Sequence, residues 1–217
     1  MDEIRRKLRS FSDAAATEGK FLDWFEQLYE YADNDSVWIP WSRGKPHPML
    51  VDWMENINQS PGTALVVGCG LGEDAMFLAN LGWEVTAFDI APTAVQWASE
   101  RYPHERIQWV VGDLLHPNEE WNSAFDFVLE VHILQAIPKD FRIVGARKLS
   151  PLVSHSGHLV CIGRLATDDS VEQNVPPWPL TKKFISSIGG DLKVVDFTTA
   201  RFEGEETVRY RAVWVNE

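Results

Sequence analysis

The stretch "ALVVGCGLGEDAMFLANLGWEVTAFD", from Ala64 to Asp89, decides the fold of this chain. It consists of an apolar run, a glycine-rich turn, a helix-like run, a second apolar run and a final acid. A strand, a tight turn and a helix in this order form a nucleotide-binding unit. A dinucleotide redox cofactor and S-adenosylmethionine both use such a unit, so the turn itself has to distinguish them.

Apolar runs typical of strands recur along the rest of the chain. We predict strands at residues 64–67, 84–89, 107–111, 125–130, 157–164, 191–199 and 206–215, and helices at 73–81, 92–102 and 139–153. The short connection at residues 200–205 leaves no room for a crossover helix, so the last two strands must pair antiparallel. The fold class is therefore α/β, a Rossmann-like seven-stranded sheet that is mostly parallel with an antiparallel last strand and helices on both faces.

The N-terminal region differs from this alternation. Residues 1–35 look helical, and "FLDWFEQLYEYA" at 21–32 has apolar residues three and four apart on one face. A loop with three prolines and a glycine follows at 34–50, and a further helix is expected at 49–57. We expect a single domain over 1–217, with a helical cap and its loop in 1–60 and a cofactor-binding core in 61–217.

Composition narrows the function. The chain of 217 residues has a formal net charge of −12 and a pI of about 4.9, so a nucleic-acid backbone would be repelled. No run reaches the roughly 20 apolar residues of a membrane span, and the N-terminus lacks the apolar core of a secretory signal. Cys69 and Cys161 lie in strand-like contexts typical of reduced core thiols. We expect a cytoplasmic, monomeric protein that acts on a small molecule.

The turn favours one of the two cofactors. The dinucleotide fingerprint is G-x-G-x-x-G/A, but here the third glycine comes one place early, at Gly72, and Glu73 stands where a small residue belongs. Glu73 and Asp74 place two carboxylates at a helix N-terminus, where they would oppose a pyrophosphate. S-adenosylmethionine has no phosphate and carries a sulfonium and an ammonium, so it fits better. A tight turn that binds nothing stays open as an alternative.

Acids at the ends of the next two strands support a nucleoside site. Asp89 ends the second strand, where a carboxylate can accept both ribose hydroxyls, and Ile90 follows it. Asp113 and Leu114 follow the third strand, where an acid can reach the adenine amino group. Taken alone, either acid is better explained as a helix N-cap. Because parallel strands end at one edge, we expect the turn and both acids to converge on one crevice.

With these residues placed, the chain resembles the class I S-adenosylmethionine-dependent methyltransferases, and within them the branch that acts on thiopurines, thiols and halides. Most of that class carry an acid two residues before the first glycine, where this chain has Val66. The branch often lacks that acid and has a G-C-G-x-G-x-D turn, which matches Gly68 to Asp74. "PWSRGKPHPML" (40–50), "LQAIPKDFR" (134–142) and "VPPWPLT" (175–181) are similar to three further segments of the branch.

The resemblance implies a set of cofactor-binding residues. Its members are Trp41, Gly68, Cys69, Gly70, Gly72, Asp74, Asp89, Ile90, Asp113, Leu114 and Glu130. Glu130, at the end of the fourth strand, is assigned to the ammonium group of the cofactor. Trp38, Arg43 and Trp178 are assigned to the acceptor, and the tryptophans either form a lid or simply cover the end of the sheet.

Methyl transfer mainly requires alignment and exclusion of water, so a protein base is optional for a thiolate acceptor. His132 is the candidate acid–base group and Arg164 the candidate that orients an anionic acceptor. A packing histidine and a surface or ion-paired arginine are the alternatives. The six histidines show no metal-ligand spacing, so no metal is expected.

The function we predict is methyl transfer to a thiol or another soft nucleophile. Transfer to oxygen or nitrogen of a small metabolite is the alternative within the same fold. A dinucleotide-dependent oxidoreductase and a non-catalytic binding module are the alternatives from other classes.

Overall fold

The computed structural model describes residues 2–17, 20–167, 176–204 and 207–217. Residues 1, 18–19, 175 and 205–206, which belong to predicted segments, lie outside the described residues. The strands are β1 (Thr63–Val67), β2 (Glu84–Asp89), β3 (Ile107–Val111), β4 (Phe125–Val131), β5 (Val153–Arg164), β6 (Lys193–Ala200) and β7 (Arg209–Val215). The helices are α1 (Asp2–Thr17), α2 (Trp24–Ala32), α3 (Pro48–Asn56), α4 (Glu73–Asn80), α5 (Pro92–Arg101), α6 (Ile133–Ala136), α7 (Lys139–Leu149) and α8 (Lys182–Ile188).

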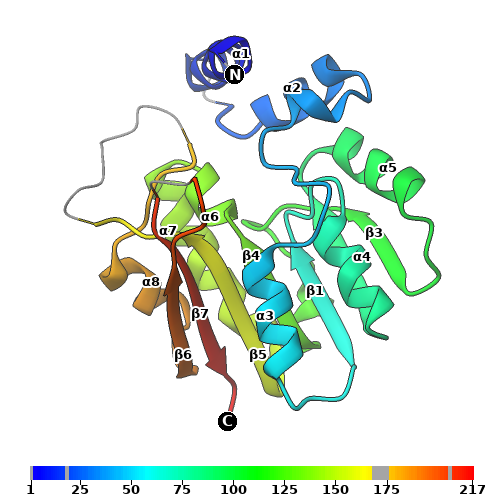
Figure 1. Cartoon of the computed structure of the whole chain (residues 1–217), viewed down its shortest axis with the longest axis vertical. Coiled ribbons are helices and arrows are strands. Elements are labelled where there is room, and N and C mark those ends of the chain that lie inside the picture. The colour runs from blue at the N-terminus through cyan, green and yellow to red at the C-terminus, as the bar shows by residue number, and fades with distance from the viewer. Residues whose placement is uncertain (1, 18–19, 168–175, 205–206) are drawn as a thin grey trace.

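The strands form one twisted sheet in the order β3-β2-β1-β4-β5-β7-β6 (Figure 1). Strand β7 runs antiparallel to both of its neighbours, and the other pairs in the sheet are parallel. The predicted fold class, with its antiparallel last strand, is therefore confirmed.

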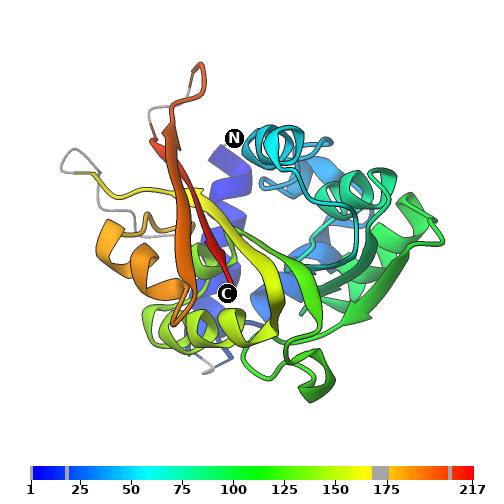
Figure 2. The same cartoon turned by 90° about the horizontal axis from the view of Figure 1, so that it is seen from below.

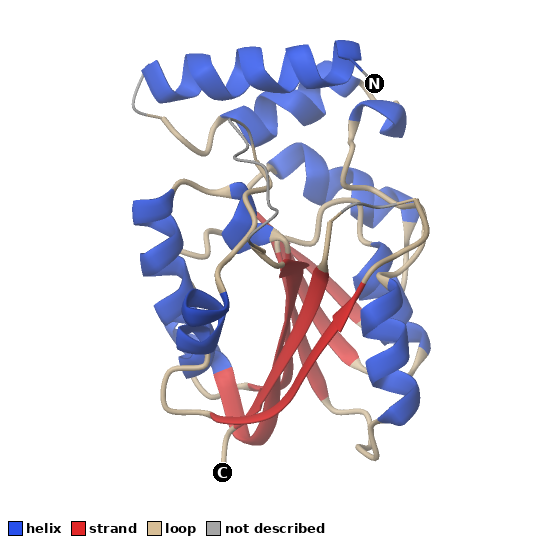
Figure 3. Cartoon of the chain, turned by 60° about the vertical axis from the view of Figure 1, so that its left-hand side comes forward, coloured by secondary structure: helices blue, strands red, loops and turns tan. Residues whose placement is uncertain are grey.

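Alternating residues of the central strands point into two separate hydrophobic cores, one on each face of the sheet. Leu65 and Val67 of β1 point into a core that α7 and α8 cover. Ala64 and Val66 point the other way, into a core that α3 and α4 cover. Figures 2 and 3 show these two helical layers on either side of the strands. Both faces of the sheet are thus buried, which explains why the strands read as continuous apolar runs.

Helices α1 and α2 lie across the carboxyl ends of the parallel strands, whereas the C-terminus lies at the other end (Figure 1). Trp24 and Leu28 of α2 pack with Leu71 of the glycine turn and with Trp97 of α5. The N-terminal extension therefore covers the edge at which a ligand site is expected. Within the described ranges, every helix is too short or too polar to span a bilayer.

Four elements differ most from the prediction. The helix expected over 139–153 ends at Leu149; the 3₁₀ turn Ser150–Leu152 follows, and β5 begins at Val153 instead of residue 157. Pro151 explains the break, since it cannot donate the N–H that would continue a helix. Helices α6 and α8 were not predicted because runs of four and seven residues are too short for a periodic pattern.

Candidate functional site

The carboxyl edge of the sheet gathers the predicted site residues in the order of its strands. Asp113 follows β3, Asp89 ends β2, and the glycine turn follows β1. His132 follows β4, and Arg164 ends β5. Charge changes sign along this edge, from acids beside β2 and β3 to cationic groups beside β5.

The glycine turn adopts a backbone that only glycine tolerates well. Gly68, Gly70 and Gly72 have φ values of +62°, +53° and +88°. A Cβ atom on Gly72 would lie 2.6 Å from the Trp109 ring, and one on Gly68 would collide with Ile133. Both glycines are therefore required by backbone conformation and by close packing.

Asp89 ties the glycine turn to the end of β2. Its Oδ2 accepts from the Gly70 N–H at 2.9 Å and its Oδ1 from the Ala91 N–H at 3.0 Å. The Cys69 N–H donates to the Phe88 carbonyl at 2.8 Å, and burial raises the pKa of the Cys69 thiol. Only 7% of Asp89 is exposed, and burial raises the pKa of its carboxyl despite these N–H donors. The N-cap interpretation of Asp89 is wrong, because the N-cap of α5 is Ala91 and no side chain caps that helix. The contact of Asp89 with a ribose stays a prediction.

The acid after β3 also bonds locally. Asp113 accepts from the Leu115 N–H at 2.8 Å and lies 2.9 Å from Nδ1 of His116. Leu114 is buried in the core and packs where a Cβ on Gly145 would stand. The side chain of Leu114 is therefore part of the core, and the assignment of this residue to the cofactor stays a prediction.

A hollow of about 310 Å³ lies between α2 and the end of β2. Its lining residues are Leu22, Asp23, Glu26, Gln27 and Ile90. Glu26 accepts from the Thr93 hydroxyl at 2.6 Å and thereby holds α2 to the start of α5. Ile90, predicted to contact the cofactor, therefore lines a cavity that also involves the N-terminal cap.

The two acids of the turn hold a loop across the first turn of α4. Residues 39–47, here called the cap loop, supply the donors. Ser42 Oγ and Gly44 N–H donate to Glu73 Oε1 at 2.5 and 3.2 Å, and the His47 N–H donates to Asp74 Oδ1 at 2.7 Å. Burial raises the pKa of Asp74 to about 6. The helix N-terminus that a pyrophosphate would need is thus occupied by carboxylates and loop.

The tryptophans of this region separate into different contacts. Trp41 donates from Nε1 to the Tyr29 hydroxyl at 2.8 Å and lies over Gly70. Trp38 instead packs edge-on against Tyr31, with ring centroids 5.1 Å apart. Trp178 lies beside Arg142, whose guanidinium carbon is 5.6 Å from the ring centroid. Among the described residues no ring contact joins these three tryptophans, and a common lid stays a prediction.

His132 is held at both ring nitrogens. Its Nδ1 lies 3.0 Å from Oε1 of Gln135, and its Nε2 lies 3.0 Å from Nη1 of Arg209. Burial lowers the pKa of His132 to about 3; the Gln135 contact opposes that change, and the Arg209 and Arg164 charges add to it. The predicted acid–base role therefore gains no support from this geometry, which agrees better with the packing alternative.

Cationic groups surround His132. Arg164 and Arg209 face each other in the register of β5 and β7, and Arg43 of the cap loop lies over the Phe202 ring at 5.9 Å. The His47 ring lies 5.8 Å from that of His132. Burial, together with His132, Arg43 and Arg209, lowers the pKa of His47 to about 2, so both rings are neutral.

Sequence reasoning missed His47 and Arg209. Arg209 gave no local signal, because it begins a strand far along the chain from its partner. His47 precedes a proline at a helix start and caps α3 by accepting from the Met49 N–H at 3.2 Å, a pattern that marks a helix start and not a site.

Glu130 is held at the start of α6, and its assignment to the ammonium group of the cofactor stays a prediction. Only 1% of the residue is exposed, and its Oε1 accepts from the Leu134 N–H at 3.0 Å, so the carboxylate caps α6. Burial raises the pKa of Glu130 to about 7.

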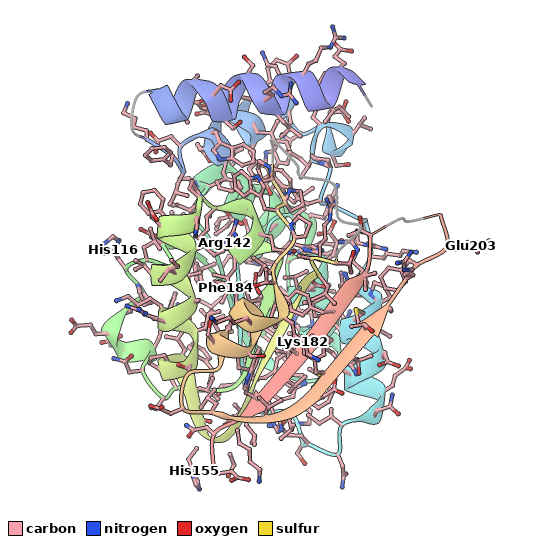
Figure 4. The ribbon with its side chains drawn as sticks, turned by 90° about the vertical axis from the view of Figure 1, so that its left-hand side faces the viewer. His116, Arg142, His155, Lys182, Phe184 and Glu203 are labelled. Carbon is pink, nitrogen blue, oxygen red and sulfur yellow. The ribbon has the colours of Figure 1, made fainter. Side chains whose placement is uncertain are left out.

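The remaining histidines lie apart from the carboxyl edge or bond elsewhere. His155, labelled in Figure 4, lies at the end of the sheet opposite α1, and His116 bonds to Asp113. Among the described residues, no three His, Cys, Asp or Glu side chains group as metal ligands.

An order of strands with an antiparallel β7, a glycine turn after β1 and acids at the ends of β2 and β3 define the class I methyltransferase fold. The chain belongs to the thiopurine S-methyltransferase family, whose model matches residues 30–207.

Individual relatives agree with this family. The chain is 30% identical over 135 residues to thiocyanate methyltransferase 1 of Brassica oleracea, a match that covers 59% of this chain and 58% of the relative. It is 27% identical over 125 residues to a probable thiol methyltransferase 2 of Arabidopsis thaliana, covering 57% of this chain and 55% of the relative. The matched part thus spans just over half the length of these relatives.

Solved structures share the fold. The N-methyltransferase NodS from Bradyrhizobium japonicum, solved with S-adenosyl-L-homocysteine, matches with a TM-score of 0.68 at 18% identity. The match covers 88% of this chain and 97% of that one.

Proposed function

We propose that this protein transfers the methyl group of S-adenosylmethionine to a small-molecule acceptor, most favourably a thiolate or a similarly soft nucleophile. The observation that carries the proposal is the cap loop held across α4 by Glu73 and Asp74. A cofactor without phosphates tolerates this arrangement, whereas a dinucleotide does not. The family and the thiol- and thiocyanate-methylating relatives support the same reaction.

The chain's residues fit that cofactor in two places. The hollow beside Ile90 has an apolar side and nearby acids, which suits an adenine and its ribose. Gly70 lies beneath Trp41 without a side chain of its own, so the turn can approach a ligand closely. The bound cofactor supplies an electrophilic methyl group on a sulfonium sulfur.

The protein's own contribution is alignment and electrostatics. A thiolate attacks the methyl carbon; the new sulfur–carbon bond forms as the methyl–sulfonium bond breaks, and the products are a methyl thioether and S-adenosylhomocysteine. Arg164 and Arg43 hold the anionic acceptor, Trp38 and Trp178 border it, and the aromatic cap of α2 and Trp41 excludes water. Because their pKa values are lowered by burial, His47 and His132 are weak bases, so the proposal favours acceptors that arrive with the proton already lost.

Binding and turnover test the proposal separately. S-adenosylhomocysteine at millimolar concentration should raise the melting temperature, and no shift would contradict the cofactor assignment. Labelled S-adenosylmethionine should then transfer its methyl group to thiophenol, 2-mercaptoethanol, thiocyanate or iodide, and phenol is the oxygen control. Binding without turnover across this panel would favour a binding module.

Methylation of oxygen or nitrogen is the second candidate, since a hydroxyl needs a base more than a thiol does. Loss of phenol turnover in His132→Ala with thiol turnover retained would favour an acid–base role for His132. We also infer a single-domain, monomeric, cytoplasmic enzyme; the buried free cysteines agree with a reducing compartment. Light scattering on the full chain tests the monomer.

A further inference from the structure

Gln135 is a fully buried glutamine in α6, beside the candidate acceptor site. Its Oε1 accepts from the Arg164 N–H at 2.7 Å, and its Nε2 donates to the Arg164 carbonyl at 2.6 Å. The side-chain amide therefore continues the hydrogen bonding of the sheet at the end of β5. Because the backbone donor and acceptor differ, they fix which end of the amide is oxygen.

The fixed amide in turn fixes the proton on His132. Oε1 of Gln135 faces Nδ1 of His132 at 3.0 Å, and a guanidinium nitrogen of Arg209 faces Nε2 at 3.0 Å. An amide oxygen only accepts and a guanidinium only donates. Nδ1 must therefore carry the hydrogen, and the lone pair on Nε2 is already used.

Gln135 also holds a second element of the acceptor site. Its backbone carbonyl accepts from the Trp178 N–H at 2.8 Å. The side chain fits because position 163 is glycine; a Cβ there would lie 2.5 Å from Oε1 of Gln135. One residue thus contacts the ends of β4 and β5 and the loop that carries Trp178.

We propose that Gln135 is the positioning residue of the acceptor site: it locks His132 as the neutral Nδ1–H tautomer and sets Arg164 and Trp178 around it, so that the protein accepts only nucleophiles that arrive ionised. The inference rests on the proposed methyl transfer. The charged and titratable groups that face His132 are Arg209 of β7, Arg164 of β5, Arg43 of the cap loop and His47 at the start of α3. The positive charges around His132 stabilise an acceptor that is deprotonated and therefore anionic.

The test combines nitrogen-15 NMR of the histidine rings with steady-state kinetics on the full chain. In the wild type, His132 should show a protonated Nδ1 and an unprotonated Nε2 from about pH 5 to 8. Gln135→Glu keeps an acceptor at Nδ1 but adds a negative charge, so His132 should become protonated within that range. Gln135→Met removes the acceptor, and the single tautomer should be lost.

Kinetics with thiophenol supply a second readout. In the wild type, the pH dependence of kcat/KM should follow the ionisation of thiophenol alone, whereas Gln135→Glu should add an ionisation of the protein. Gln135→Met should raise KM for thiophenol by about tenfold and change kcat less, as expected for one lost network of buried hydrogen bonds. Gln96→Met, an exposed glutamine on α5, is the matched control and should change neither.

S-adenosylhomocysteine binding checks that each variant is folded. An Nε2–H tautomer in the wild type, or identical His132 spectra in wild type and Gln135→Glu, would overturn the proposal even if methyl transfer is found. If no acceptor turns over, the spectra still decide the role of Gln135, and only the proposed acceptor class fails. If Gln135→Met does not fold, the wild type and Gln135→Glu suffice.

Discussion

The two halves of the carboxyl edge are built in different ways. In the cofactor half, around β1, β2 and β3, Asp89 and Asp113 bond to backbone N–H groups within two residues or in the adjacent turn. In the acceptor half, around β4, β5 and β7, side chains that are far apart in the sequence bond to each other. His132 and Arg209, for example, are 77 residues apart.

This difference separates geometry that nearby residues set from geometry that only the tertiary structure sets. The geometry of the cofactor half is set by glycines and acids in turns that follow the adjacent strands β1 and β2. The acceptor half exists only when β7 has inserted beside β5 and brought Arg209 to His132. Substitutions in the two halves should therefore differ in how they change stability and ligand affinity.

The largest effect is expected for Gly72→Ala in the cofactor half. The positive φ and the short approach to Trp109 together should lower the free energy of unfolding by about 2–5 kcal/mol. Gly204→Ala is the matched control, because Gly204 has φ +77° and nothing within 4 Å of its added Cβ. Urea denaturation measures both variants, and equal losses would contradict the packing argument.

Asp89→Leu should come next. It leaves the N–H groups of Gly70 and Ala91 without acceptors and should cost about 2–4 kcal/mol of stability. Binding of S-adenosylhomocysteine, measured by calorimetry, should fall at least about tenfold, whereas Asp89→Asn should retain part of it. Wild-type affinity in the leucine variant would show that the turn does not depend on this carboxylate.

Asp74→Asn tests the link between the halves through pH. Since burial raises the folded-state pKa of Asp74 to about 6, the folded protein binds this proton more tightly than the unfolded chain. Wild-type stability should therefore fall as pH rises from about 4 to about 6, by up to about 3 kcal/mol. Asparagine lacks this ionisation but can still accept from the His47 N–H.

Urea denaturation near pH 4.5 and near pH 7 checks this expectation. The free energy of unfolding of Asp74→Asn, taken relative to that of the wild type, should be higher at about pH 7 than at about pH 4.5. Ser42→Ala loosens the same loop without removing a charge, so its difference from wild type should not depend on pH in this way. The same dependence in both variants would assign the effect to another group.

The smallest effect is expected for Trp38→Ala. Trp38 packs on Tyr31 and is assigned to the acceptor instead of the cofactor, so its removal should change S-adenosylhomocysteine affinity less than about twofold. Trp41→Ala, which loses the bond to Tyr29 and the cover over Gly70, should weaken it about tenfold. If calorimetry shows comparable losses of affinity in both variants, the result would support a common tryptophan lid.

Much of the fold was predictable because its signals are local. Apolar runs separated by turns gave all seven strands, and the short connection before β7 gave its direction. The start of β5 and the helices α6 and α8 escaped prediction, since Pro151 and runs of a few residues carry no periodicity.

The site residues also divide into those that a local motif predicts and those whose contacts depend on strand pairing. The glycines and Asp89 lie where the motif predicts, because a motif is a statement about neighbouring residues. The assignments of Glu130 and Leu114 to the cofactor stay predictions, since nothing near them in the sequence shows toward which side of the sheet edge a side chain turns. Gln135 stood beside His132 in the sequence, but its bonds to Arg164 depend on the pairing of β4 with β5.

The sequence alone determined the strand–turn–helix unit, the acids at the strand ends and the incompatibility of "GCGLGED" with a pyrophosphate. These follow from backbone conformation and from charges placed a few residues apart. Only the tertiary structure decided what Glu73 and Asp74 hold, which nitrogen of His132 carries its proton and which arginines lie beside it. Those features depend on hydrogen bonds between residues that approach one another only after the sheet has formed.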